Sequence, residues 1–264
     1  MSAESIRRKL MIWRSLAFAA ILESVRRKDL YVAVILAGLM IAAAALMGKF
    51  GVQGLEMFLK DVTLNVINLF SVLLAILFAA RQIPEELTRR TVYPLLARPI
   101  SRFDLIFGKF LGAFLMSSLG LILFAAIGVG ALACLGLSLG SIFWQYLLLR
   151  FLSLALICAM SVMLSLLMTP SATVTLAILL AIGSQTFSQA ILLAYGPASE
   201  TGKGLMRVSY YVLPHLDLFD LSKKVGYGWK PIDAWVLRDL FLYAMAYTIV
   251  FLLVAALRFR RQTI

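Results

Sequence analysis

The chain has 264 residues, of which 62% are hydrophobic and 14% are charged, and its mean hydropathy is +0.95. Soluble domains are about 45–50% apolar and about 25% charged, so this composition excludes a large water-soluble core and indicates an integral membrane protein. The net charge of +12 would suggest a nucleic-acid partner in a soluble protein. Here the basic residues flank apolar segments, so membrane topology and anionic lipid explain the charge better, and no nucleic-acid partner is expected.

The first 29 residues carry seven lysines and arginines around a short apolar piece, residues 15–22. A membrane span needs about 20 apolar residues, so this piece is too short to cross a bilayer. Because Trp13 and Phe18 accompany it, we expect a helix that lies on the membrane surface. A helical extension of the first span is the alternative. No cleavage site precedes the first strong apolar run, which we expect to act as an uncleaved signal-anchor.

Six apolar runs follow, and they predict an all-α polytopic membrane protein built as a single transmembrane domain with six spanning helices. In the third span, Gly108 and Gly112 form a pair of small residues that lets two helix backbones approach closely. The Thr169-Pro170-Ser171 break separates the fourth span from the fifth. The predicted spans cover residues 30–47, 62–80, 105–134, 143–168, 172–195 and 235–257.

Six spans place both termini on one side of the membrane, and the distribution of basic residues indicates which side. Residues 1–29, 81–109 and 258–264 hold 16 lysines and arginines, whereas the opposite loops, residues 49–61 and 196–234, hold 7. The positive-inside rule then places both termini in the cytoplasm and the protein in the cytoplasmic (inner) membrane. We expect the loop 196–234 to form short helices at the outer face. Arg150, inside the fourth span, should extend outward to water.

The segment 81–104 between the second and third spans is the most informative polar stretch of the chain. Ser101 and Asp104 have the spacing of a capping box that opens the next helix. We expect a helix end near Glu86, a short helix over residues 92–97 that Thr91 caps, and a turn at Pro99. A segment of this length and charge is typical of a docking site. A solvated loop that only fixes the topology explains the pattern equally well.

This segment resembles the cytoplasmic signature of permeases of the ABC-2 transporter superfamily. That signature runs I-x-x-E, then G-T, then leucines, then P-x-S-R and G-K. One departure is Arg90, which stands where the family usually has glycine. The matching residues are Ile83, Glu86, Thr91, Leu95, Leu96, Pro99, Ser101, Arg102, Gly108 and Lys109.

The resemblance implies a type V exporter-like permease subunit with an N-terminal elbow helix, which works as a dimer with a close or identical copy. It also implies a separate cytoplasmic ABC ATPase subunit that holds ATP and Mg, so this chain would be no enzyme and would carry no cofactor. Residues 81–104 would then dock in the ATPase and couple ATP hydrolysis to export. Glu86 and Thr91 would anchor the segment, and Arg102 and Lys109 would lie near lipid phosphates. The residues that the resemblance assigns to ATPase coupling are Glu86, Thr91, Leu95, Leu96, Arg98, Pro99 and Arg102.

Two groups of polar residues lie within predicted spans: Asn65 and Asn68 in the second, and a set in the fifth. Such residues either form hydrogen bonds between helices or line a pathway, and both explanations stay open. The candidates for a substrate pathway are Asn65, Asn68, Ser184, Gln185, Ser188 and Gln189.

Motifs for other chemistry are weak or missing. The sequence has no G-x-x-x-x-G-K-[ST] motif, and Gly202-Lys203-Gly204 is predicted to be a turn. His215, Asp217 and Asp220 form the one metal-like cluster, for which exposed polar positions are the commoner explanation, so neither a metal nor a catalytic residue is expected. The alternative to a permease is a membrane anchor that does not transport but links a cytoplasmic ATPase to an outer-face protein, with residues 196–234 as its working surface.

Overall fold

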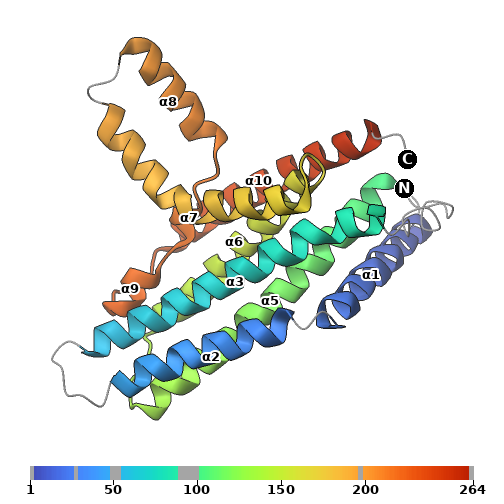
Figure 1. Ribbon diagram of the computed structural model, residues 1–264. Coiled ribbons are helices and arrows are strands. Elements are labelled where there is room, and N and C mark those ends of the chain that lie inside the picture. Colours follow the sequence, from blue (N-terminus) through green and yellow to red (C-terminus); the bar gives the residue numbers. More distant parts are fainter. Residues whose placement is uncertain (1–2, 27–28, 48–54, 89–100, 196–198, 262–264) are drawn as a thin grey trace.

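The computed structural model describes residues 3–26, 29–47, 55–88, 101–195 and 199–261, and the regular structure within these ranges is helical (Figure 1). Among these residues, four helices are long and apolar enough to cross a membrane. This confirms the all-α class and the composition of a membrane protein. The four helices are α3 (Leu55–Thr88), α5 (Arg102–Cys134), α6 (Ile142–Ser165) and α10 (Ala234–Arg261).

The predicted first and fifth spans form helices at the expected places, α2 (Asp29–Met47) and α7 (Pro170–Tyr195). The apolar stretches described within them, Leu30–Ala43 and Pro170–Ser184, are shorter than the other four. The described residues therefore support four spans by length and composition, and the number six stays a prediction.

Helices α3 and α6 form the centre of the bundle, because α3 packs against α2, α5, α6 and α7. Leu64 and Ile67 on α3 are fully buried, as is Tyr146 on α6. The Tyr146 hydroxyl donates a hydrogen bond of 3.0 Å to the carbonyl of Leu64. An apolar interior with its polar atoms paired across helices gives the bundle a fixed register at this level.

Helix boundaries follow the local signals in the sequence. The predicted capping box is present: Ser101 is the N-cap of α5, and its hydroxyl accepts a 3.1 Å hydrogen bond from the backbone N–H of Asp104. Helix α7 begins at Pro170, where a proline costs no hydrogen bond. Helix α3 ends at Thr88, two residues beyond the predicted end.

Helix α1 (Ala3–Arg26) packs lengthwise along the first turns of α5. The two helices run parallel at this contact: Trp13 lies beside Asp104, and two turns further along both helices Ala20 lies beside Gly112. A Cβ added at Gly112 would lie 2.5 Å from the Cβ of Ala20, and one at Gly108 would lie 2.6 Å from the Cβ of Leu16. The predicted close approach at the glycine pair is confirmed, and the partner is the N-terminal helix. Its expected position on the membrane surface stays a prediction.

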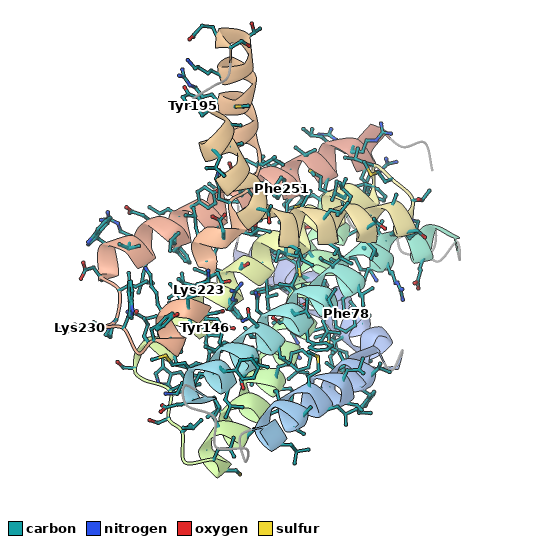
Figure 2. All side chains as sticks on the ribbon, turned by 60° about the vertical axis from the view of Figure 1, so that its left-hand side comes forward. Phe78, Tyr146, Tyr195, Lys223, Lys230 and Phe251 are labelled. Carbon is teal, nitrogen blue, oxygen red and sulfur yellow. The ribbon has the colours of Figure 1, made fainter. Side chains whose placement is uncertain are left out.

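Residues 199–234 contain α8 (Glu200–Val212), the 3₁₀ helix η2 (Leu216–Phe219) and α9 (Ser222–Gly226), as predicted for short helices. The prediction of a turn at residues 202–204 is wrong, since they lie in the first turns of α8. There Lys203 forms an ion pair of 3.1 Å with Glu200. The C-terminal part of α7 and α8 form a hairpin that projects from the bundle (Figures 1 and 2). Arg207 on α8 donates a 3.0 Å hydrogen bond to the Tyr195 hydroxyl on α7.

Candidate functional site

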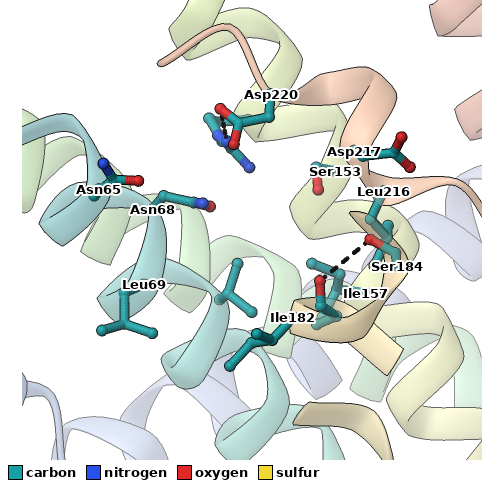
Figure 3. Close-up of a pocket in the computed structure, with 13 residues that line it drawn as sticks. Asn65, Asn68, Leu69, Ser153, Ile157, Ile182, Ser184, Leu216, Asp217 and Asp220 are labelled. Carbon is teal, nitrogen blue, oxygen red and sulfur yellow. Dashed lines mark hydrogen bonds and ion pairs between the residues drawn. The ribbon is translucent and has the colours of Figure 1, made fainter. Parts of the chain in front are cut away.

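A polar cavity of about 310 Å³ lies between α3, α6, α7 and η2 (Figure 3). Three of the six residues predicted for a substrate pathway come together here: Asn65 and Asn68 from α3, and Ser184 from α7. Four further polar residues line the cavity and were not predicted as pathway residues. These are Arg150 and Ser153 from α6, and Asp217 and Asp220 from the segment around η2.

Helical spacing explains how two of the four elements present their polar groups to one space. Residues three apart lie on the same face of a helix, so Asn65 and Asn68 face the cavity together, as do Arg150 and Ser153. Leu69, Ile157 and Leu216 complete the wall with apolar surface. The cavity is therefore polar on some sides and apolar on others.

Arg150 is buried, with 4% of its surface exposed, so the prediction that it extends outward to water is wrong. Its Nη2 forms an ion pair with Oδ1 of Asp220, and its guanidinium lies 5.4 Å from the centre of the Tyr146 ring. The segment after η2 folds back over α6 and brings a carboxylate to the arginine. A buried charge is tolerated only with such a partner.

Asp220 is fixed from its other side by Ser222. The Ser222 backbone N–H and hydroxyl donate hydrogen bonds of 2.9 and 2.6 Å to its Oδ1. Burial by itself would raise the pKa of Asp220, but the guanidinium of Arg150 and the hydrogen bonds from Ser222 outweigh it, so the pKa lies below its ordinary value. Asp220 is thus held as a carboxylate at neutral pH.

Several buried polar atoms in the cavity wall have no hydrogen-bond partner within the described residues. They are Oδ1 of Asn68, Oγ of Ser153, Nε of Arg150 and Oδ1 of Asp217. In contrast, Asn65 donates to the Asp61 carbonyl at 2.9 Å. Burial of unpaired polar atoms is costly, so a cavity that concentrates them is suited to a polar occupant. The side chains of Gln185, Ser188 and Gln189 lie outside what the structure describes.

The metal-like cluster in the sequence is not assembled as one site. His215 Nδ1 lies 3.9 Å from Asp217 Oδ1, while Asp220 is engaged with Arg150. No group of three histidine, cysteine or acidic residues suited to a metal occurs in the part of the chain that the structure describes. His215 is only 8% exposed, so the expectation of an exposed position is wrong for it. Its backbone N–H donates to the Tyr243 hydroxyl at 2.9 Å, which draws the segment against α10.

The segment 81–104 that the resemblance assigns to ATPase coupling, called the connector below, is described only at its two ends, residues 81–88 and 101–104. Glu86 lies in the last turn of α3, and Arg102 opens α5. Thr91, Leu95, Leu96, Arg98 and Pro99 lie outside the described residues.

Arg102 bonds within the chain, and its expected place near lipid phosphates stays a prediction. Its Nη1 donates hydrogen bonds of 2.9 and 3.1 Å to the carbonyls of Phe259 and Arg260 in the last turn of α10. Basic side chains at a helix C-terminus satisfy carbonyls that lack a partner in the helix. Lys109 is 2% exposed and so does not face lipid phosphates. Asp104, which lies between Arg102 and Gly108 of the predicted motif, accepts a 2.8 Å hydrogen bond from Nε1 of Trp13.

The described chain is therefore an all-helical protein of the membrane class, with four helices long and apolar enough to cross a bilayer and a polar cavity among its helices. Residues 30–264 match the family model described as "Protein of unknown function (DUF2705)", and the chain belongs to this family. No curated protein matches the sequence.

Proposed function

We propose that this chain is the membrane-spanning permease subunit of an ABC-2-type transporter in the cytoplasmic membrane, with both termini in the cytoplasm. It works with a second permease copy and with a separate cytoplasmic ATPase that binds ATP and Mg. The observation that carries the proposal is the polar cavity: unpaired polar atoms gather between helices that are otherwise apolar. Polar residues at such positions are typical of a substrate pathway. The resemblance of the connector to the ABC-2 signature supports the ATPase as a partner.

The length of α3 supports a role in coupling the two sites. The helix runs from the cavity at Asn68 to its end at Thr88. At 1.5 Å per residue this stretch is roughly 30 Å long, which is about the thickness of the hydrocarbon core. We therefore expect a displacement of the connector at the Thr88 end of α3 to reach the cavity wall at Asn68.

The first turn of α5 offers a second route for the same motion. It follows the connector directly, and its side chains bind both ends of the chain: Trp13 bonds to Asp104, and Arg102 bonds to the last turn of α10. A displacement of the connector would move α1, α5 and α10 together. This behaviour is what a permease requires of a segment that receives force from an ATPase.

The test is to replace Leu95 and Leu96 with glutamate and to measure ATPase capture by the purified full-length chain. Candidate partners are the P-loop ATPases encoded in the same genome, and proteoliposomes of the pair give the rate of ATP hydrolysis. We expect the double variant to stay in the membrane and to lose ATPase capture, because two charges replace an apolar docking surface. Leu218→Glu, the same change at an exposed leucine of η2, is the control. Unchanged capture and hydrolysis in the double variant would refute the proposal.

A second candidate function is a membrane anchor that transmits force to a partner protein without transport. The observation that favours it is the α7–α8 hairpin, which projects from the bundle and carries the exposed Leu193 (Figure 2). A projecting arm of this kind is suited to a protein partner. Stable co-purification of an outer-face protein, with an ATP hydrolysis rate that no solute changes, would favour the anchor over the permease.

A further inference from the structure

We propose that the polar cavity binds a small organic ammonium ion that carries an apolar chain. The proposal rests on the proposed function only where it names this ion as the transported class of substrate. The binding itself is a property of the cavity in this chain. Three observations carry it: the charge of the lining, the unpaired acceptors and the apolar wall.

The charged residues that line the cavity favour a cation. They comprise one arginine and two aspartates, so the lining carries a net charge of −1 when all three are ionised. The ion pair with Asp220 and the ring of Tyr146 hold the guanidinium of Arg150, and within the described residues its Nε is left without a hydrogen-bond partner. The remaining charge of the lining is that of Asp217, whose Oδ1 lies 3.9 Å from Nδ1 of His215. Charges within a partly buried site interact more strongly than in water.

The unpaired side chains of the wall offer acceptors for an ammonium group. Ser153 is 1% exposed and its hydroxyl has no hydrogen-bond partner within the described chain. The buried Oδ1 of Asn68 is unpaired in the same way. Figure 3 shows Ser153 and Asn68 on opposite sides of the space between α6 and α3, with Asp217 beyond Ser153 and its carboxylate turned away from both side chains. An ammonium group has three donors and no acceptor, so it can donate to the Ser153 hydroxyl and to Oδ1 of Asn68.

The remaining wall is apolar and fits a short alkyl chain. Val72, Ile157 and Ile182 belong to this part of the lining. Each methylene buried against such a wall raises affinity about fourfold. A water molecule occupies about 30 Å³ of liquid, so the cavity of about 310 Å³ has ample room for a chain of six carbons and its head group.

An anionic head group fits less well. A carboxylate at Arg150 would have to displace Asp220, which Ser222 holds by two hydrogen bonds. It would also meet the negative charge of Asp217, and within the part of the chain that the structure describes the one donor of Arg150 left for it would be Nε. The same chain with a neutral hydroxyl keeps the apolar contacts and loses the charge attraction. The three head groups therefore give three different expected affinities.

The experiment titrates the purified full-length chain in lipid nanodiscs with hexylammonium, hexan-1-ol and hexanoate, with empty nanodiscs as the reference. We expect hexylammonium to bind at one saturable site, at least tenfold more tightly than hexan-1-ol, and hexanoate to bind most weakly. Equal affinities for the three probes, or tighter binding of hexanoate, would overturn the proposal.

Two variants locate the site within the chain. Asp217→Asn should weaken hexylammonium binding about tenfold, and Ser153→Ala should weaken it a fewfold. Asp239→Asn removes the same charge from an exposed site on α10, and Thr248→Val removes a buried unpaired hydroxyl outside the cavity, so both should bind as the parent does. If Asp217→Asn fails to fold, Ser153→Ala keeps the test valid, because it removes only an unpaired hydroxyl. If the cavity variants and the control variants lose hexylammonium affinity to the same extent, the ion does not bind in this cavity.

No ATPase is present in this experiment, so its outcome is separate from that of the connector variants. If hexylammonium does not bind, the ammonium proposal fails, and the variants of Leu95 and Leu96 still test whether the chain captures an ATPase. Loss of the ATPase partner leaves the ammonium site to be decided by the titration.

Discussion

Gly112→Ala tests the close packing of α1 on α5. The new Cβ would lie 2.5 Å from the Cβ of Ala20 and 3.2 Å from the carbonyl oxygen of Ala17. Neither atom belongs to a flexible side chain, so the two helices must separate. Overpacking of this kind costs about 1–3 kcal/mol, and the better helix propensity of alanine returns about 1 kcal/mol. We expect a net loss of up to about 2 kcal/mol in the free energy of unfolding.

Gly130→Ala is the matched control, because it lies on the same helix and no heavy atom lies within 4 Å of its new Cβ. This variant gains the propensity term without a clash. The difference between the two alanine variants therefore isolates the packing term of about 1–3 kcal/mol. Ala20→Gly combined with Gly112→Ala should recover much of the loss, since it removes the atom that the new methyl meets.

The assay is reversible unfolding in mixed micelles, driven by an increasing share of dodecyl sulfate and followed by the helical circular dichroism signal. The parent, both alanine variants and the double variant are compared under one condition. Gly112→Ala as stable as Gly130→Ala would refute the packing of α1 against α5. If Gly112→Ala lowers the free energy of unfolding and adding Ala20→Gly does not reduce that loss, Ala20 is not the residue that the new methyl group meets.

Two further predictions concern the ion pair in the cavity wall. Arg150→Met leaves Asp220 without its buried partner and should lower the free energy of unfolding by about 3 kcal/mol in the same assay. The double variant Arg150→Met with Asp220→Asn should recover part of that loss. If it recovers none, the ion pair with Asp220 is not the source of the stability that Arg150 contributes. The folded-state pKa of Asp220 lies below its ordinary value, so its stabilisation is fully present above the unfolded-state pKa of about 3.9 and is lost as the pH falls through the folded-state pKa. The stability difference between the parent and Asp220→Asn should therefore shrink below about pH 4, and a difference that grows with acid would contradict the sign of the shift.

Local signals in the sequence predicted the helices and one of their caps. Apolar runs gave the positions of the main helices, and the spacing of Ser101 and Asp104 gave the start of α5. The pair Gly108 and Gly112 indicated a close helix contact, which the structure contains. Such features depend on residues within one or two turns of each other, so a single sequence carries them.

Partners distant in the chain could not be predicted in this way. Arg150 was expected to extend to water, because nothing near it in the sequence offers a carboxylate, yet Asp220 supplies one from another segment. Arg102 bonds to carbonyls 157 and 158 residues away, and no residue near it in the sequence indicates these acceptors. An arginine inside an apolar helix is itself a signal for a missing partner. Applied to Arg150, that rule would have added it to the cavity residues.

The hydrogen bonds of Arg102 also impose an order on biosynthesis. The side chain belongs to the start of α5, but its acceptors, the carbonyls of Phe259 and Arg260, are made 157 and 158 residues later. At about 5–20 residues per second, translation takes roughly 10–30 s to supply them. A nascent chain that stops before α10 leaves this guanidinium without those carbonyls, so the two hydrogen bonds form only after α10 has been synthesised.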